Sequence, residues 1–205
     1  IKKVMRKLFL TIMFVGFIGS LYAQDITLPT PKKTGGKPLM EALNQRQTSR
    51  DFSEKELDMQ TLSNLLWATY GFNRTDKRVV PSSQNRQEID LYVMLKSGVY
   101  FYDGKANKLI QKAKGDHRKS VGSQDFVFTA PVNLIMVANL DKASNRDAAC
   151  IDAGFLIQSA YLFCASEGNL GAVARGYFDK AQIKNLLKLG DKQEAIITQT
   201  IGYKK

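Results

Sequence analysis

The chain has 205 residues and a formal net charge of +11, with 30 Lys and Arg against 19 Asp and Glu. This length suits one domain with a substantial core. The basic residues are scattered and form no RNA- or DNA-binding signature, so no nucleic-acid partner is expected. A single His and two Cys provide no ligand cluster of ordinary zinc spacing and no Ser-His-Asp triad, so no metal site is predicted.

The first 23 residues have the pattern of a secretory signal peptide. Four basic residues among the first seven precede an apolar run from Leu8 to Ala23, which is shorter than the about 20 residues of a membrane span. We expect cleavage after Ala23 and a periplasmic location. Leu21 is not the small residue that such sites favour, so an uncleaved membrane anchor stays open. The expected division is a signal peptide (1–23), an extended Pro- and Gly-rich arm (24–37) and one domain (38–205).

Hydrophobic periodicity then predicts an α+β domain, with a central mixed sheet and helices packed over it. Strands are expected where apolar residues alternate or run continuously, at 89–95, 99–102, 132–138, 171–174 and 195–203. Helices are expected where the period is 3.6, at 39–47, from Asp58 to about 70, at 116–122, 147–166 and 179–189. The polar stretch 73–87 is expected to be a loop.

The longest of these helices, 147–166, is apolar around most of its circumference. Such a helix is buried in a core or against a partner subunit. Cys150 and Cys164 both lie in it, and fourteen helical residues span about 21 Å. A disulfide needs Cα atoms within about 7 Å, so these two cysteines are expected to be free, buried, small apolar residues.

A polar stretch, Arg46-Gln47-Thr48-Ser49-Arg50-Asp51-Phe52, follows the first helix. Two guanidinium groups and two hydroxyls suit the oxygens of an anion such as phosphate. The same residues also suit a solvated helix end whose cations complement the helix dipole. The stretch alone leaves both interpretations open. Because the chain has no metal-binding cluster and no acid–base inventory, an enzyme of this sequence would need an organic cofactor.

Several segments together resemble the FMN-dependent nitroreductase family. Residues 46–52 resemble its R-R-S-x-R-x-F/Y segment, with Gln47 and Thr48 replacing the second Arg and the Ser. The loop 81–87 (PSSQNRQ) resembles its P-S-(S/A)-x-N-x-Q loop. Residues 168–171 with 176–179, and 201–203, resemble its G-L-G…G-F-D and closing I-G-Y segments. The similarity extends over about residues 38–203 and is closest to the branch of azoline-forming oxidases, although their Lys–Tyr pair is not identified here.

The resemblance implies a nitroreductase-like fold in an intertwined homodimer with FMN at the dimer interface. By position, Arg46, Thr48 and Arg50 would hold the FMN phosphate and ribityl chain, with Gln47 near the ring and Lys204 or Lys205 completing the phosphate site. The other protomer would contribute Pro81, Ser82, Ser83 and Asn85. Backbone donors near the flavin N5 would come from Ala174, Arg175 and Gly176. None of these residues is expected to be catalytic.

The implied activity is that of an exported FMN-dependent oxidoreductase with a ping-pong mechanism. A small-molecule donor would reduce FMN, and an acceptor such as a nitroaromatic compound or a quinone would reoxidise it. NAD(P)H is not expected outside the cytoplasm, so the donor is left open. Two other classes also stay open: a flavin-binding electron-transfer protein without turnover of its own, and an interaction protein that kept the fold without the cofactor.

Overall fold

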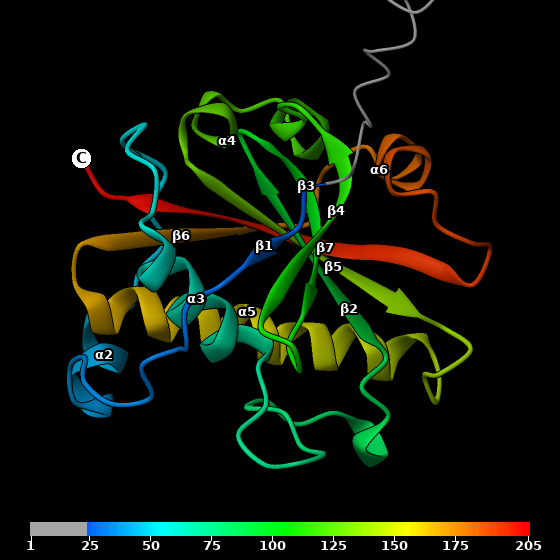
Figure 1. Ribbon diagram of the computed structural model, residues 1–205, viewed down its shortest axis with the longest axis horizontal. Coiled ribbons are helices and arrows are strands. Elements are labelled where there is room, and N and C mark those ends of the chain that lie inside the picture. Colours follow the sequence, from blue (N-terminus) through cyan, green and yellow to red (C-terminus); the bar gives the residue numbers. More distant parts are fainter. Residues whose placement is uncertain (1–23) are drawn as a thin grey trace, which may run out of the picture.

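The structure, a computed structural model, describes residues 24–205 and contains a single seven-stranded sheet (Figure 1). The predicted signal peptide lies outside the described residues. In spatial order the sheet is β1-β4-β3-β2-β5-β7-β6. The strands are β1 (Ile26–Thr27), β2 (Ile89–Leu95), β3 (Gly98–Asp103), β4 (Lys108–Lys114), β5 (Val132–Asn139), β6 (Leu170–Arg175) and β7 (Gln193–Tyr203). All their ladders are antiparallel, and the parallel part of the predicted mixed sheet is one isolated bridge from Thr48 to Ala172. The predicted α+β class is confirmed.

Helices cover both faces of the sheet. On one face lie α2 (Leu39–Gln45), α3 (Met59–Tyr70) and α5 (Arg146–Glu167); on the other lie the 3-10 turn η2 (Arg118–Val121), α4 (Asp125–Thr129) and α6 (Lys180–Leu187). In Figure 1, α5 runs beneath the sheet with α2 and α3 beside it, while α4 and α6 lie above. A further 3-10 turn, η1 (Ser83–Asn85), lies in the loop before β2.

The central strand β5 shows how the sequence produces these two layers. Successive side chains of a strand point to opposite faces. Leu134 and Met136 therefore pack in the cluster under α3 and α5, while Ile135 and Val137 pack in the cluster under η2, α4 and α6. All four are fully buried. A strand buried on both faces needs the nearly continuous apolar run that predicted it.

Helix α5 is the longest element and packs lengthwise against the sheet. Its N-terminus is capped by Asn145, whose side-chain oxygen accepts a hydrogen bond from the Ala148 N–H at 2.8 Å. It is long and apolar enough to cross a membrane by length and composition, but half of it is buried in the core. Cys150 and Cys164 are free, as predicted. Ile151 and Phe155 lie one turn apart and are 61% and 41% exposed, so this helix also presents an apolar face outward.

The structure corrects several predicted boundaries. Strand β4 and helix α4 were not predicted, and the expected helix at 116–122 is the shorter η2. The first helix ends at Gln45, so Arg46 is its C-cap, with an extended backbone. The N-terminal arm contributes β1, which pairs with β4. These differences matter for the site because they move Arg46 and Gln47 from the end of the predicted helix into the extended segment that continues to residue 52.

Candidate functional site

Residues 46–52 run along the free edge of β6. Thr48 forms a parallel bridge with Ala172, and the Ser49 N–H donates to the Ala172 carbonyl at 3.0 Å. The seam is close-packed at Gly171, where an added Cβ would lie 2.6 Å from the Ser49 Cβ and 3.0 Å from the Lys204 Cγ. Only a glycine allows this approach. The sequence therefore places the polar stretch against the end of β7 as well as against β6.

Three cations in the segments that form this seam have no carboxylate partner. Within residues 24–205, Arg46, Arg50 and Lys204 form no ion pair; the pair between Asp51 and Lys205, at 3.7 Å, is the acidic contact nearby. Arg50 and Lys204 are exposed and Arg46 is half-buried. Uncompensated guanidinium groups beside hydroxyls and open backbone form a ready anion site. The structure thus favours the anion-cradle interpretation over that of a solvated helix end.

Tyr161 on α5 connects this segment to the end of β6. Its hydroxyl accepts the Ala174 N–H at 2.8 Å and lies 3.3 Å from the Thr48 Oγ1. The Arg46 guanidinium carbon lies 5.4 Å from its ring centroid, within cation–π range. Tyr161 lies in the predicted apolar helix 147–166, and it is buried. A tyrosine in an otherwise apolar helix face was the one signal that a hydroxyl was needed there.

The three predicted residues at the end of β6 differ in what they can offer. The Ala174 N–H is already bound to the Tyr161 hydroxyl. The Arg175 side chain points to the opposite face, where it donates to the Val121 carbonyl and to Thr200 Oγ1 at 3.0 Å. Burial without a carboxylate lowers the pKa of Arg175 to about 10. The Gly176 N–H makes no hydrogen bond within residues 24–205 and is exposed, so it is the open backbone donor of this group.

The predicted loop residues Pro81, Ser82, Ser83 and Asn85 lie elsewhere in the same chain. Their loop contacts the N-terminal half of α5, where the Ser83 N–H donates to Asp152 at 2.7 Å. Residues 46–50 contact α5 at Tyr161, nine residues later, which is about 14 Å along a helix. One chain therefore does not bring its two predicted halves of the site together.

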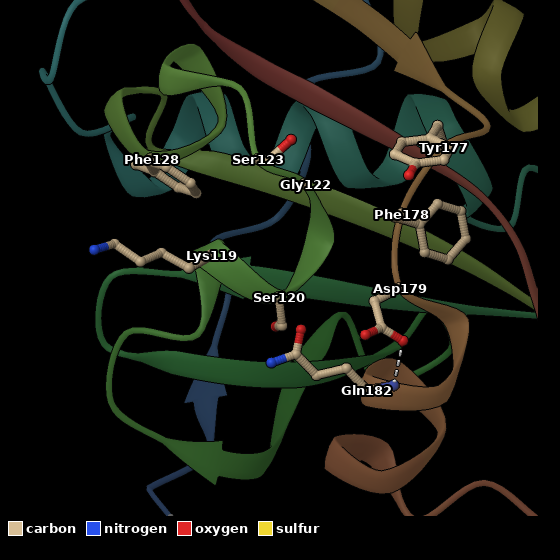
Figure 2. Close-up of a pocket in the computed structure, with 9 residues that line it drawn as sticks. All are labelled: Lys119, Ser120, Gly122, Ser123, Phe128, Tyr177, Phe178, Asp179 and Gln182. Carbon is tan, nitrogen blue, oxygen red and sulfur yellow. Dashed lines mark hydrogen bonds between the residues drawn. The ribbon is translucent and has the colours of Figure 1, made fainter.

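The cavities of the single chain also show that one chain does not form a complete cofactor site. The crevice between Gln47, Tyr161 and Lys204 encloses about 20 Å³, far too little for a ring system. A larger cavity of about 620 Å³ lies on the opposite face of the sheet, between η2, α4 and the start of α6. Figure 2 shows Lys119 and Phe128 on one side of it and Tyr177 and Phe178 on the other. None of the predicted site residues lines this cavity.

The described residues also contain no group of three or more His, Cys, Asp or Glu placed to hold a metal ion. His117, the single histidine, is half-buried and its Nε2 lies 2.8 Å from the Lys114 carbonyl oxygen. The chemistry of the seam is therefore that of cations, hydroxyls and backbone donors.

Comparison with known proteins agrees with the motif order. Residues 43–203 match the model of the nitroreductase family. A nitroreductase-type protein of Ralstonia eutropha is 38% identical, superimposes with a TM-score of 0.83, and the match covers 92% of each chain. No curated protein matches the chain.

Two more distant structures share the fold alone. An FMN-dependent nitroreductase of Clostridium difficile is 19% identical, with a TM-score of 0.57 over 81% of this chain and 87% of the other. A chain of the E. coli microcin synthetase McbBCD complex is 15% identical, with a TM-score of 0.67 over 92% of this chain and 77% of the other.

Proposed function

Since this chain belongs to the nitroreductase family of oxidoreductases, we propose that it is an FMN-dependent oxidoreductase that works as a homodimer. The observation that carries the proposal is the group of three unpaired cations, Arg46, Arg50 and Lys204, along the β6 seam. An exposed row of cations without acidic partners is suited to the phosphate of FMN. The family membership supplies the class of chemistry, and the seam supplies a place for the cofactor.

The chemistry of the residues present fits the phosphate and ribityl end of FMN, while the ring needs space that the crevice of one chain does not provide. The phosphate would be held by the two guanidinium groups and the Lys204 ammonium, and the hydroxyl of Thr48 would reach the ribityl chain. Gly171 keeps the seam narrow, and the open Gly176 N–H offers a donor for the ring edge. Bound FMN supplies the redox chemistry, accepting a hydride from a donor and passing electrons to an acceptor such as a nitroaromatic compound or a quinone.

The protein's own part is to bind, orient and provide positive charge. The Tyr161 hydroxyl contacts both Thr48 and Ala174 and so fixes their relative positions. The phosphate end and the ring end of the site would therefore stay at a constant distance from each other. The cations of the seam raise the local positive potential, which would favour binding of the anionic phosphate of FMN. The side chain of Arg175 acts on the other face and is assigned no contact with FMN.

A second copy of the chain is needed to complete this site. Loop 81–85 lies about 14 Å along α5 from Tyr161 in its own chain. Apolar side chains meanwhile remain exposed on α2 and α5, namely Leu39, Met40, Leu43, Ile151 and Phe155. An exposed apolar face of this kind marks an interface. Packing two copies through it would deliver the loop of one protomer to the seam of the other.

The proposal includes export, because residues 1–23 have the sequence pattern of a signal peptide. N-terminal sequencing of the secreted protein should then begin at Gln24. An uncleaved N-terminus on protein recovered from the membrane fraction would instead indicate a membrane anchor, and protein confined to the cytoplasm would rule out export.

Purified protein should be yellow, with a flavin absorption spectrum, and should reduce a quinone or a nitroaromatic compound with saturable kinetics. Arg46→Ala and Arg50→Ala should each weaken FMN binding about 10- to 100-fold, because each removes a charge-assisted contact of about 1.5–3 kcal/mol. Lys192→Ala is the matched control, because Lys192 is an exposed lysine directly before β7, at the opposite end of that strand from Lys204. Colourless protein that cannot be reconstituted would contradict the flavin assignment, and a yellow protein without turnover would indicate an electron carrier.

Tyr161→Phe should weaken FMN binding by about tenfold, because it leaves the Ala174 N–H without a partner, a loss of about 1–3 kcal/mol. Fluorescence titration of apoprotein with FMN measures this. Tyr100→Phe is the control, since that buried tyrosine on β3 also has a hydroxyl contact, 3.0 Å from Ser97 Oγ, but lies far from the seam. Equal affinities of the two variants would show that Tyr161 has no part in the cofactor site.

A further inference from the structure

Two buried carboxyl groups lie in contact where the loop before β2 meets α5. Glu88 is fully buried, and neither of its carboxyl oxygens has a hydrogen-bond donor within residues 24–205. Its neighbour is Asp152 on α5, which is 3% exposed. Ionised carboxylates only accept hydrogen bonds. Two of them side by side are therefore unsatisfied unless a proton lies between them.

Burial, and then the contact with Asp152, raise the pKa of Glu88 to about 7. Nearby positive charge offsets this only in part, because Arg86 lowers the pKa of Glu88 by less than burial raises it. Arg86, in the preceding loop, is exposed and hydrogen-bonds Gln84 and the Lys142 carbonyl. The hydroxyl of Tyr70 on α3 is buried without a partner, and burial also raises the pKa of Asp90, two residues along β2.

The Asp152 carboxylate in turn holds the loop. Its Oδ2 accepts the Ser83 N–H at 2.7 Å, and this is the contact that fixes the start of η1 on α5. The loop needs such a restraint because Gln84, Asn85 and Gln87 all have positive φ, between 50° and 56°. Non-glycine residues rarely adopt this conformation and keep it only when surrounding contacts enforce it.

We infer that Glu88 and Asp152 share one proton, and that this protonated pair is a positioning device that keeps residues 81–85 in the shape the flavin site requires. The inference rests on the proposed function for its link to FMN, but not for the proton itself. With the proton present, Glu88 donates to Asp152, and Asp152 stays free to accept from Ser83. When the proton leaves, two buried negative charges repel, and the loop loses its anchor.

The pH dependence follows from the direction of the shift. A raised pKa means that the folded protein keeps a proton that the unfolded chain has released above about pH 4.5. The stabilisation from this group is complete below that pH and is lost as the pH rises to about 7. Glu88→Gln keeps the size of the side chain and always carries a hydrogen-bond donor. It should therefore remove the loss of stability between about pH 4.5 and pH 7.

The first arm of the test uses the apoprotein and needs no flavin. The melting temperature of the wild type should fall, relative to that of Glu88→Gln, by roughly 5–10 °C between about pH 5 and pH 8. Asp152→Asn should flatten the profile as well, because its amide can donate to Glu88 while its oxygen accepts from Ser83. Glu54→Gln, an exposed carboxyl without an ion pair in residues 24–205, should keep the wild-type profile. Wild-type pH dependence in both Glu88→Gln and Asp152→Asn would overturn the shared proton.

The second arm measures FMN dissociation from the dimer across the same pH range. The wild type and Glu54→Gln should lose about tenfold in affinity relative to Glu88→Gln as the pH rises through about 7. Titration of the FMN phosphate, with a pKa near 6, is common to all variants and cancels in this ratio. A constant ratio would overturn the positioning role even if the first arm succeeds. Absence of FMN binding at every pH would defeat the proposed function, and the first arm would still decide the shared proton.

Discussion

Ile151→Asp combined with Phe155→Asp is expected to give a folded monomer that binds FMN at least about 100-fold more weakly. The two side chains lie one helical turn apart on α5 and are 61% and 41% exposed, so the charges cost the isolated chain little. In a dimer packed through this face, however, two copies of each charge would be buried without partners, which is strongly unfavourable. Loss of the partner also removes loop 81–85 from the flavin site.

Light scattering during gel filtration measures the mass of the particle. The absorbance of the retained flavin measures how much FMN stays bound. Met59→Asp is the matched control, because Met59 is an equally exposed apolar residue, 46%, on α3. It should remain dimeric and yellow. A double variant that stays dimeric would place the interface on another surface, and a monomer that keeps full FMN affinity would show that one chain suffices for the cofactor.

Gly171→Val is expected to abolish detectable FMN binding while the domain remains folded. Its Cβ would lie 2.6 Å from the Ser49 Cβ, a contact that neither backbone can relieve without moving. Overpacking of this kind costs about 1–3 kcal/mol. The strain is relieved most easily by lifting residues 48–50 off β6, because they are held there by few hydrogen bonds. Thr48 and Arg50 would then move away from Lys204.

Thermal unfolding followed by circular dichroism shows whether the domain is folded. FMN titration shows whether it still binds the cofactor. Gly190→Ala is the control, since an added Cβ there meets only a Gln193 side chain at 3.8 Å. A Gly171→Val protein that binds FMN normally would mean that the seam is not the phosphate site.

The elements with strong local signals could be predicted from the sequence. Asp58 caps α3 as expected, with its carboxylate accepting the Thr61 N–H, and the apolar run of β5 is the doubly buried strand that it indicated. Strand β4 was missed because Lys108, Lys112 and Lys114 interrupt its apolar residues, and a β-bulge between Gln111 and Ala113 breaks the apolar alternation. A near-edge strand of this kind is specified by its neighbours more than by its own sequence.

The residues of the candidate site could be predicted from the sequence, but the contacts between them could not. The motifs identified the seam residues, but Tyr161 falls at a helical core position, and only the fold shows its hydroxyl between Thr48 and Ala174. Strand alternation does separate Ala174 from Arg175, yet which face each would take depends on the whole sheet. Glu88 lies between the predicted loop 73–87 and the predicted strand 89–95, and burial of its carboxyl depends on α5, which lies far away in sequence.

The sheet order has a practical consequence for how the molecule can be attached to a surface. The chain enters the fold through β1, at one edge of the sheet, and the cationic seam lies along β6, at the other edge. Six strand spacings separate these edges, or about 29 Å. An anchor or an immobilising tag joined ahead of Gln24 would therefore hold the protein by its far side and leave the seam facing solution. A tag joined after Lys205 would begin beside the seam and crowd it.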